Sequence, residues 1–165
     1  ENADESILEV AVIKSYFAKV LAQEWQEKQE NRDAMRKEAR EEISEQNKRL
    51  FGIANKHGVK DFSWFNNAWY MWLYGMRNSE LLKYKWLWKD KLLDRASMIE
   101  LTANLSRITE TENMLISENA QTQTQAEQIH FSVGKHIREE VLEKYGLTPE
   151  NLPPNVHIEH IEDKP

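Results

Sequence analysis

Apolar and polar residues follow each other along this chain in patterns that predict helices and almost no strand. Residues 7–21 are apolar around most of a helical circumference, which is typical of a helix buried on several sides. From residue 24 to residue 49, acidic and basic residues interleave, many at i,i+4 spacing, above one apolar stripe. We therefore expect one long helix over residues 5–57, or two helices with a joint near residues 29–34, ending at Gly58.

Four shorter helical patterns follow, each bracketed by residues that favour a helix end. We expect these helices at residues 62–74, at 80–93 after a cap at Asn78 or Ser79, at 98–116 and at 126–145. Asp61 and Ser97 suit N-caps, because their side-chain oxygens can accept a hydrogen bond from an unpaired backbone N–H. Gly75 and Gly146 suit left-handed C-caps. A Gln- and Thr-rich connector over residues 117–127 separates the last two helices.

The end of the chain has a different character. Prolines interrupt the sequence from residue 149 onward, and residues 156–161 alternate like a short edge strand or an extended arm. We expect a helical domain over residues 1–146 and a proline-punctuated extended tail over residues 147–165. The predicted fold class is all-α, an irregular helical bundle with a long N-terminal helix and an extended C-terminal tail.

Aromatic residues gather between residues 61 and 91, a stretch that holds five of the six tryptophans. Aromatic rings bury a large area per residue, so this stretch is expected to build the core, with one or two of Trp64, Trp86 and Trp88 exposed. Its second half is also locally basic, and base-on-ring stacking contributes about 1–3 kcal/mol per base without needing a sequence. The candidate nucleic-acid-binding residues are Lys83, Lys85, Trp86, Trp88, Lys89, Lys91, Lys135 and Arg138.

A second candidate surface lies in the helix expected at residues 98–116. Glu100, Asn104, Arg107 and Thr111 are three or four residues apart, which places them on one helical face. A carboxylate, an amide and a guanidinium together suit either a buried hydrogen-bond network or a stripe that recognises a protein partner. The network interpretation is slightly favoured, and the four residues are the candidate partner-binding set.

Composition and charge limit the classes of function. A length of 165 residues with 40% hydrophobic content fits one domain, and a net charge of -6 argues against a protein that coats nucleic acid by charge alone. The chain has no cysteine, so it has no disulfide or thiolate site. It has no 18-residue apolar run and no signal peptide, which predicts a cytoplasmic protein without a membrane span. Because the chain opens with Glu1 rather than Met, we expect a processed product or a fragment.

The sequence offers little support for catalysis. It lacks a Gly-x-Ser-x-Gly elbow and a phosphate-binding glycine loop, because its five glycines are scattered singly. His130 and His136 are six residues apart, which does not align two metal ligands on one helical face as a spacing of four would. His157 and His160 are close in sequence but suit only adventitious metal binding. We therefore expect no metal, no cofactor and no enzymatic activity.

Several blocks of this sequence, in order, resemble the C-terminal helical portion of the DNA-damage-inducible protein D (DinD) family. The blocks are SYFA at 15–18, EQNKRL at 45–50, HGV at 57–59, DF at 61–62, LYGM at 73–76, ELTANL at 100–105, RITETE at 107–112, HFSVGK at 130–135, IR at 137–138 and ENLP at 150–153. The resemblance covers nearly the whole chain. It departs from the family at Trp69, Trp72 and Trp86, where this chain has bulky rings and the family tends to have glycines.

The resemblance implies a bacterial, SOS-associated protein without known enzymatic chemistry that is linked to RecA and to RecA filaments on single-stranded DNA. It also implies an N-terminal module similar to phage antirepressor DNA-binding domains, which this sequence does not contain. The favoured hypothesis is a regulator that binds RecA or its filament. The alternative is a nucleic-acid-binding or antirepressor-like accessory module that uses the basic aromatic run at residues 77–91. A homodimer through residues 7–21 is also plausible.

Overall fold

The computed structural model describes the backbone of residues 2–160 and the side chains of residues 22–23 and 27–160. Within these residues the fold is all-α as predicted, with five α-helices, three short 3-10 helices and no strand. The chain divides into two compact units, Glu1–Met35 and Arg36–Pro165, and each is described by itself. Among the described residues, no helix is long and apolar enough to cross a membrane, and no three histidine or acidic side chains gather as metal ligands.

The first helix, α1 (Asn2–Lys56), provides unit 1 and the opening segment of unit 2. It is a single helix, so the alternative with a joint near residues 29–34 is not the one observed. In unit 2 its apolar stripe is buried as expected, through Ala39, Ile43, Leu50 and Ala54. The predicted homodimer contact at residues 7–21 falls on side chains outside the described residues.

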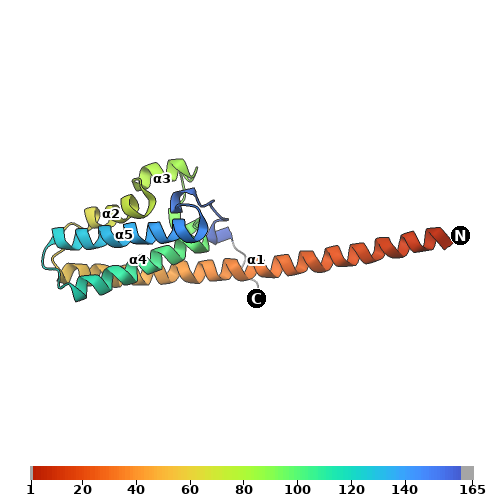
Figure 1. Cartoon of the computed structure of the whole chain (residues 1–165), viewed down its shortest axis with the longest axis horizontal. Helices are drawn as coiled ribbons and strands as arrows, with labels where there is room; N and C mark the ends of the chain where they lie inside the picture. Colours follow the sequence, from red (N-terminus) through yellow and green to blue (C-terminus); the bar gives the residue numbers. More distant parts are fainter. Residues whose placement is uncertain (1, 161–165) are drawn as a thin grey trace. The chain divides into compact units, whose positions relative to one another are not determined.

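Three further helices complete the bundle of unit 2: α2 (Phe62–Tyr74), α4 (Met98–Ser117) and α5 (Gln123–Tyr145). Helix α5 contacts both α2 and α4 (Figure 1). Two of the predicted N-caps are confirmed: Asp61 Oδ1 accepts from Trp64 N at 2.9 Å, and Ser97 Oγ accepts from Glu100 N. Helix α5 begins three residues earlier than expected, because the Thr122 hydroxyl caps it by accepting from Gln125 N.

The prediction of a helix over residues 80–93 is wrong. Helix α3 (Asn78–Tyr84) begins earlier, with Arg77 rather than Asn78 or Ser79 at its N-cap, and it ends before Lys85. Trp86 then adopts a left-handed backbone with φ 59°, and a short 3-10 helix η1 (Leu92–Asp94) follows. The Lys85 side chain turns into the bundle at this point, which residue periodicity does not reveal.

The core of unit 2 is a cluster of apolar side chains contributed by all four long helices. Its fully buried members include Leu50, Phe65, Leu73, Leu101 and Ile137. Helices α2 and α5 pack closely because α5 carries a glycine at the contact: a Cβ added to Gly134 would lie 2.8 Å from the Cβ of Trp72. That close contact places α2 and α5 side by side, and these two helices form most of the groove described in the next subsection.

Hydrogen bonds that involve the backbone of the tail join it to the rest of unit 2. Asn155 N donates to Arg95 O at 2.8 Å, and Lys85 Nζ donates to Leu152 O at 2.9 Å. The tail contains two 3-10 helices, η2 (Pro149–Asn151) and η3 (Ile158–His160). Because residues 158–160 are helical, the edge-strand alternative is not what the structure shows. The division into a domain and a tail at residue 146 stays a prediction.

Candidate functional site

The four polar residues predicted as a partner-binding face are buried in unit 2. Glu100, Asn104, Arg107 and Thr111 all face the interior of the bundle from α4. Their contacts are with this chain, which agrees with the network interpretation that the sequence favoured. In this conformation they offer no exposed surface to a partner, and their role in binding stays a prediction.

One end of this network is a buried ion pair. Lys85 Nζ lies 2.6 Å from Glu100 Oε1, and both side chains are shielded from solvent. Burial raises the pKa of the Glu100 carboxyl, and the Lys85 ammonium opposes that rise. Asn104 continues the network by donating to Glu100 O at 2.8 Å and to the Tyr74 hydroxyl at 3.3 Å. These contacts tie α4 to α2 and to the segment after α3.

The other end is a buried guanidinium. Arg107 Cζ lies 4.6 Å from the centroid of the Trp69 ring, and Arg107 donates to Asn47 Oδ1 at 3.3 Å. Among the described side chains no carboxylate pairs with it, and burial lowers the pKa of Arg107 to about 10. Its Nη1 lies 3.3 Å from His130 Nε2, and burial together with this guanidinium holds the pKa of His130 well below its ordinary value. His130 is therefore neutral, and the cluster serves packing and orientation.

The basic aromatic run is exposed at the end of α3 and in the segment that follows it. Trp86 and Trp88 are 79% and 61% exposed, and their rings meet edge to face with centroids 6.1 Å apart. Lys83, Lys89 and Lys91 are exposed in the same stretch. We call these five residues the tryptophan prong. Trp64 is also exposed, so all three tryptophans in question face solvent where one or two were expected.

Two residues of the predicted nucleic-acid set have charges that are paired within the chain, and their part in nucleic-acid binding stays a prediction. Lys85 is buried between Glu100 and the carbonyl of Leu152. Arg138 makes a two-pronged ion pair with Glu150 and also donates to the carbonyl of Leu73. Lys135 is exposed, but it lies on α5 with Glu139 3.8 Å away, rather than in the prong. Five of the eight candidate residues, those of the tryptophan prong, are therefore exposed in one stretch of the chain.

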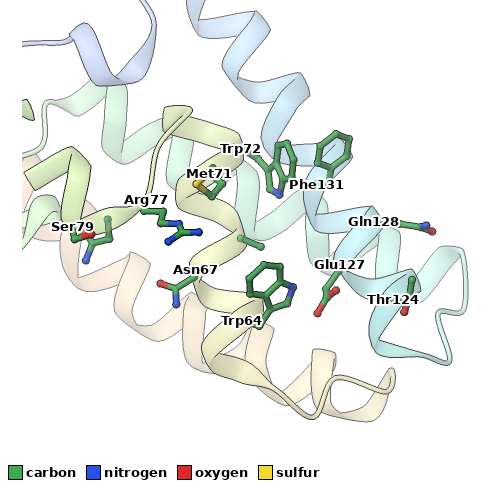
Figure 2. Close-up of a pocket in the computed structure, with 12 residues that line it drawn as sticks. Trp64, Asn67, Met71, Trp72, Arg77, Ser79, Thr124, Glu127, Gln128 and Phe131 are labelled. Atoms are coloured by element: carbon green, nitrogen blue, oxygen red, sulfur yellow. The ribbon is translucent and has the colours of Figure 1, made fainter.

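A second surface, which sequence reasoning missed, is a groove of about 840 Å³ between α2, the start of α3 and α5 (Figure 2). We call it the aromatic groove. Its apolar lining includes Trp64, Met71, Trp72 and Phe131. The rings of Trp72 and Phe131 pack edge to face, with centroids 3.9 Å apart and an interplanar angle of 83°. Its polar lining includes Asn67, Arg77, Glu127 and Gln128.

The sequence carries a recognisable pattern for only one of the two walls of this groove. Trp64, Ala68, Met71 and Trp72 are spaced at i, i+4, i+7 and i+8, which marks one face of α2. The opposite face of α2 is equally apolar, so the spacing does not say which face is buried. The other wall comes from Phe131 and its neighbours on α5, which only the folded chain brings to α2.

Comparison with known proteins gives two matches. The family model for the DinD C-terminal domain matches residues 29–161. The chain is also similar to DNA damage-inducible protein D of Escherichia coli (strain K12), with 36% identity over 174 residues, covering 99% of this chain and 64% of that protein. The chain therefore spans slightly less than two thirds of the length of this relative. No solved structure matches the chain significantly.

Proposed function

This chain belongs to the DinD C-terminal domain family, and from that premise we propose that it is a non-enzymatic regulator in the bacterial DNA-damage response. In this proposal its helical bundle binds RecA filaments on single-stranded DNA and changes their state. The name of the E. coli relative, DNA damage-inducible protein D, supports the damage-response part. The single observation that supports the binding part is the tryptophan prong.

The prong combines exposure with backbone strain. A bulky residue with positive φ is an outlier whose conformation costs on the order of 1–3 kcal/mol, and Trp86 has φ 59°. Its ring is also the most exposed of the large apolar side chains described. Neither feature stabilises the isolated bundle. Tryptophan is, in contrast, one of the residue types enriched among the energetic hot spots of protein interfaces.

The prong is held rigidly, which favours binding. Lys85 and Leu87 on either side of Trp86 are both buried, so the ring between them is presented from a fixed backbone. A preorganised anchor loses less conformational entropy when a partner arrives. The exposed lysines at 83, 89 and 91 suit an acidic partner surface or the phosphates of the single-stranded DNA in a filament.

The test is a titration of the chain against RecA filaments assembled on single-stranded DNA, with RecA alone and DNA alone as controls. Replacing Trp86 and Trp88 together by Ala should weaken filament binding at least about tenfold, because central tryptophans carry much of the energy of an interface. The matched control is Tyr145→Ala, since Tyr145 is an exposed aromatic residue, 44% exposed, that lies outside the prong and the groove. Unchanged filament binding by the double variant would reject the prong as the anchor.

A second candidate function is direct binding of single-stranded DNA by the same prong. The paired rings of Trp86 and Trp88 offer stacking surfaces beside three exposed lysine ammonium groups. If the three lysines contact phosphates, log K should fall with log salt concentration at a slope of about −2, from about −0.7 per contact on a single strand. An unchanged tryptophan fluorescence on titration with DNA alone at low salt excludes this candidate and leaves the filament hypothesis standing.

A further inference from the structure

The aromatic groove places stacking surfaces beside hydrogen-bonding groups on a scale that fits a small ligand. Its volume of about 840 Å³ lies within the range of about 300–1,000 Å³ that is usual for ligand pockets. Trp64 makes no ring contact with any described residue and is 59% exposed, so one face of its indole is open to the groove (Figure 2). Trp72 and Phe131 form a second aromatic wall.

The polar lining has the groups that recognise a base edge. Asn67 and Gln128 carry exposed amides that have no hydrogen-bond partner among the described residues, and an amide offers both a donor and an acceptor. Glu127 accepts one hydrogen bond from Gln123 Nε2 at 2.8 Å. Its remaining acceptor positions suit an exocyclic amino group such as those of cytosine or adenine.

The groove also has a cation without an internal counter-charge. Arg77 lies at the N-cap of α3, and its backbone N–H donates to Glu80 at 2.9 Å, while its guanidinium forms no ion pair with any described side chain. A free guanidinium presents paired N–H donors that match phosphate oxygens. The groove therefore joins a place for a flat aromatic ring to a place for an anion.

We propose that the aromatic groove binds one nucleotide: Trp64 stacks on the base, Asn67, Glu127 and Gln128 contact its edge, and Arg77 contacts its phosphate. The source is either a free nucleotide or one unstacked nucleotide of a single strand, which share this chemistry. A protein helix fits the groove less well, because its apolar face would desolvate the two amides and the Glu127 carboxylate without replacing their hydrogen bonds.

This site shares no residue with the tryptophan prong, so its test needs no RecA. The probe is a set of deoxynucleoside 5′-monophosphates titrated into the whole chain, followed by the six indole N–H resonances of its tryptophans. Binding should shift the resonances of Trp64 and Trp72 and leave those of Trp86 and Trp88 in place. Trp64→Ala should weaken binding about tenfold. Tyr145→Ala, which removes an exposed aromatic side chain at the C-terminal end of α5, should have no effect.

Two further variants separate the parts of the site. The wild-type chain should bind a nucleoside monophosphate more tightly than its nucleoside, and Arg77→Gln should abolish that difference. Glu127→Gln should remove a preference for cytosine or adenine over thymine. Circular dichroism of each variant confirms that the helices remain, which keeps a loss of binding distinct from a loss of fold.

The source of the nucleotide is decided by competition. A hexanucleotide without a terminal phosphate displaces the monophosphate if the groove takes a residue of a strand, and fails to displace it if the groove takes free nucleotides. Either result supports the site. The proposal is overturned if monophosphates at millimolar concentration leave the Trp64 and Trp72 resonances unshifted, or if binding is unchanged by both Trp64→Ala and Arg77→Gln.

Discussion

At the residue scale, the most distinctive block of the family resemblance is an internal polar network. Several of its buried atoms have no hydrogen-bond partner among the described residues, including Asn104 Oδ1, Arg107 Nε, Thr111 Oγ1 and His130 Nδ1. An unsatisfied buried polar atom costs about 1–3 kcal/mol. The network therefore selects one arrangement of α4 and α5 rather than adding much stability.

His130 gives this network a pH dependence. Its pKa is held well below 6.5 by burial and by Arg107, so the unfolded chain takes up a proton below pH 6.5 and the folded chain does not. The free energy of unfolding should therefore fall as the pH drops below about 6.5, by at most about 1.4 kcal/mol per pH unit from this group. His130→Gln should flatten that slope in urea denaturation measured from pH 7.5 to 5.5.

The matched control for this prediction is His136→Gln, because His136 is exposed on the same helix. It should keep the wild-type slope. The slope is a better readout than the stability itself, since His130 also packs edge to face on Phe65 at 4.3 Å and its loss lowers stability at every pH. Equal slopes for wild-type and His130→Gln would show that the buried imidazole is not the titrating group.

The ion pair of Lys85 and Glu100 makes a separate prediction. Lys85→Met leaves a carboxylate in the interior without its counter-charge, which should cost about 3–5 kcal/mol. Adding Glu100→Gln removes that charge while keeping a side chain that accepts from Ser97 N, so the double variant should recover part of the loss. Urea denaturation of the two single variants and the double variant gives the coupling energy. Additive losses would mean that the pair does not act as a unit.

At the element scale, α2 is a helix with two apolar faces. Phe65, Trp69 and Leu73 enter the core, while Trp64 and Met71 remain exposed. The run predicts the helix and both its caps, because Asp61 and Gly75 are local signals. It does not predict which face is buried, since that depends on where α5 packs. The predicted end of helix α3 is wrong for a similar reason. The helix ends where Lys85 turns inward toward Glu100, and that contact is not visible in the local sequence.

The contact between α2 and α5 depends on Gly134. A Cβ at this position would lie 2.8 Å from the Trp72 Cβ, so the helices must move apart to accept it. Gly134→Ala should therefore lower the free energy of unfolding by about 1–3 kcal/mol, as overpacking does elsewhere. Because Trp72 also lines the aromatic groove, the same variant should disturb any ligand that the groove holds.

Gly52→Ala provides the control for that substitution. Gly52 lies inside α1 and has no atom within 4 Å of an added Cβ, so alanine there should raise stability by about 0.5–1 kcal/mol through helix propensity alone. Thermal and urea unfolding of the two variants should thus move in opposite directions. A Gly134→Ala variant as stable as the wild-type chain would mean that α2 and α5 do not pack this closely.

At the scale of the whole molecule, the sequence predicts the class of fold better than the location of function. Helix caps and apolar stripes are local, so the all-α bundle follows from them. The aromatic groove is not local, because Trp64 and Phe131 are 67 positions apart by their numbering and meet only in the folded chain. The sequence does not reveal the ion pairs either, since the partner of Arg138 lies in the tail and the partner of Lys85 lies in α4.

The division of the chain into two units makes the last prediction. Among the side chains that the structure describes, those of the buried core lie in Arg36–Pro165, and the family match begins at residue 29. A fragment covering residues 29–165 should therefore fold by itself and unfold in one cooperative transition, because the hydrophobic burial that drives folding is retained. Circular dichroism during heating, with the full chain as reference, measures this.

The same fragment tests the predicted homodimer. Residues 7–21 are apolar on more faces of a helix than one neighbour covers, so the full chain is expected to associate through them. Light scattering should then give a dimer mass for the full chain and a monomer mass for residues 29–165. A dimeric fragment would move the contact into unit 2, where the exposed tryptophans are the first candidates for substitution. A fragment that fails to fold would show instead that residues 1–28 stabilise the bundle.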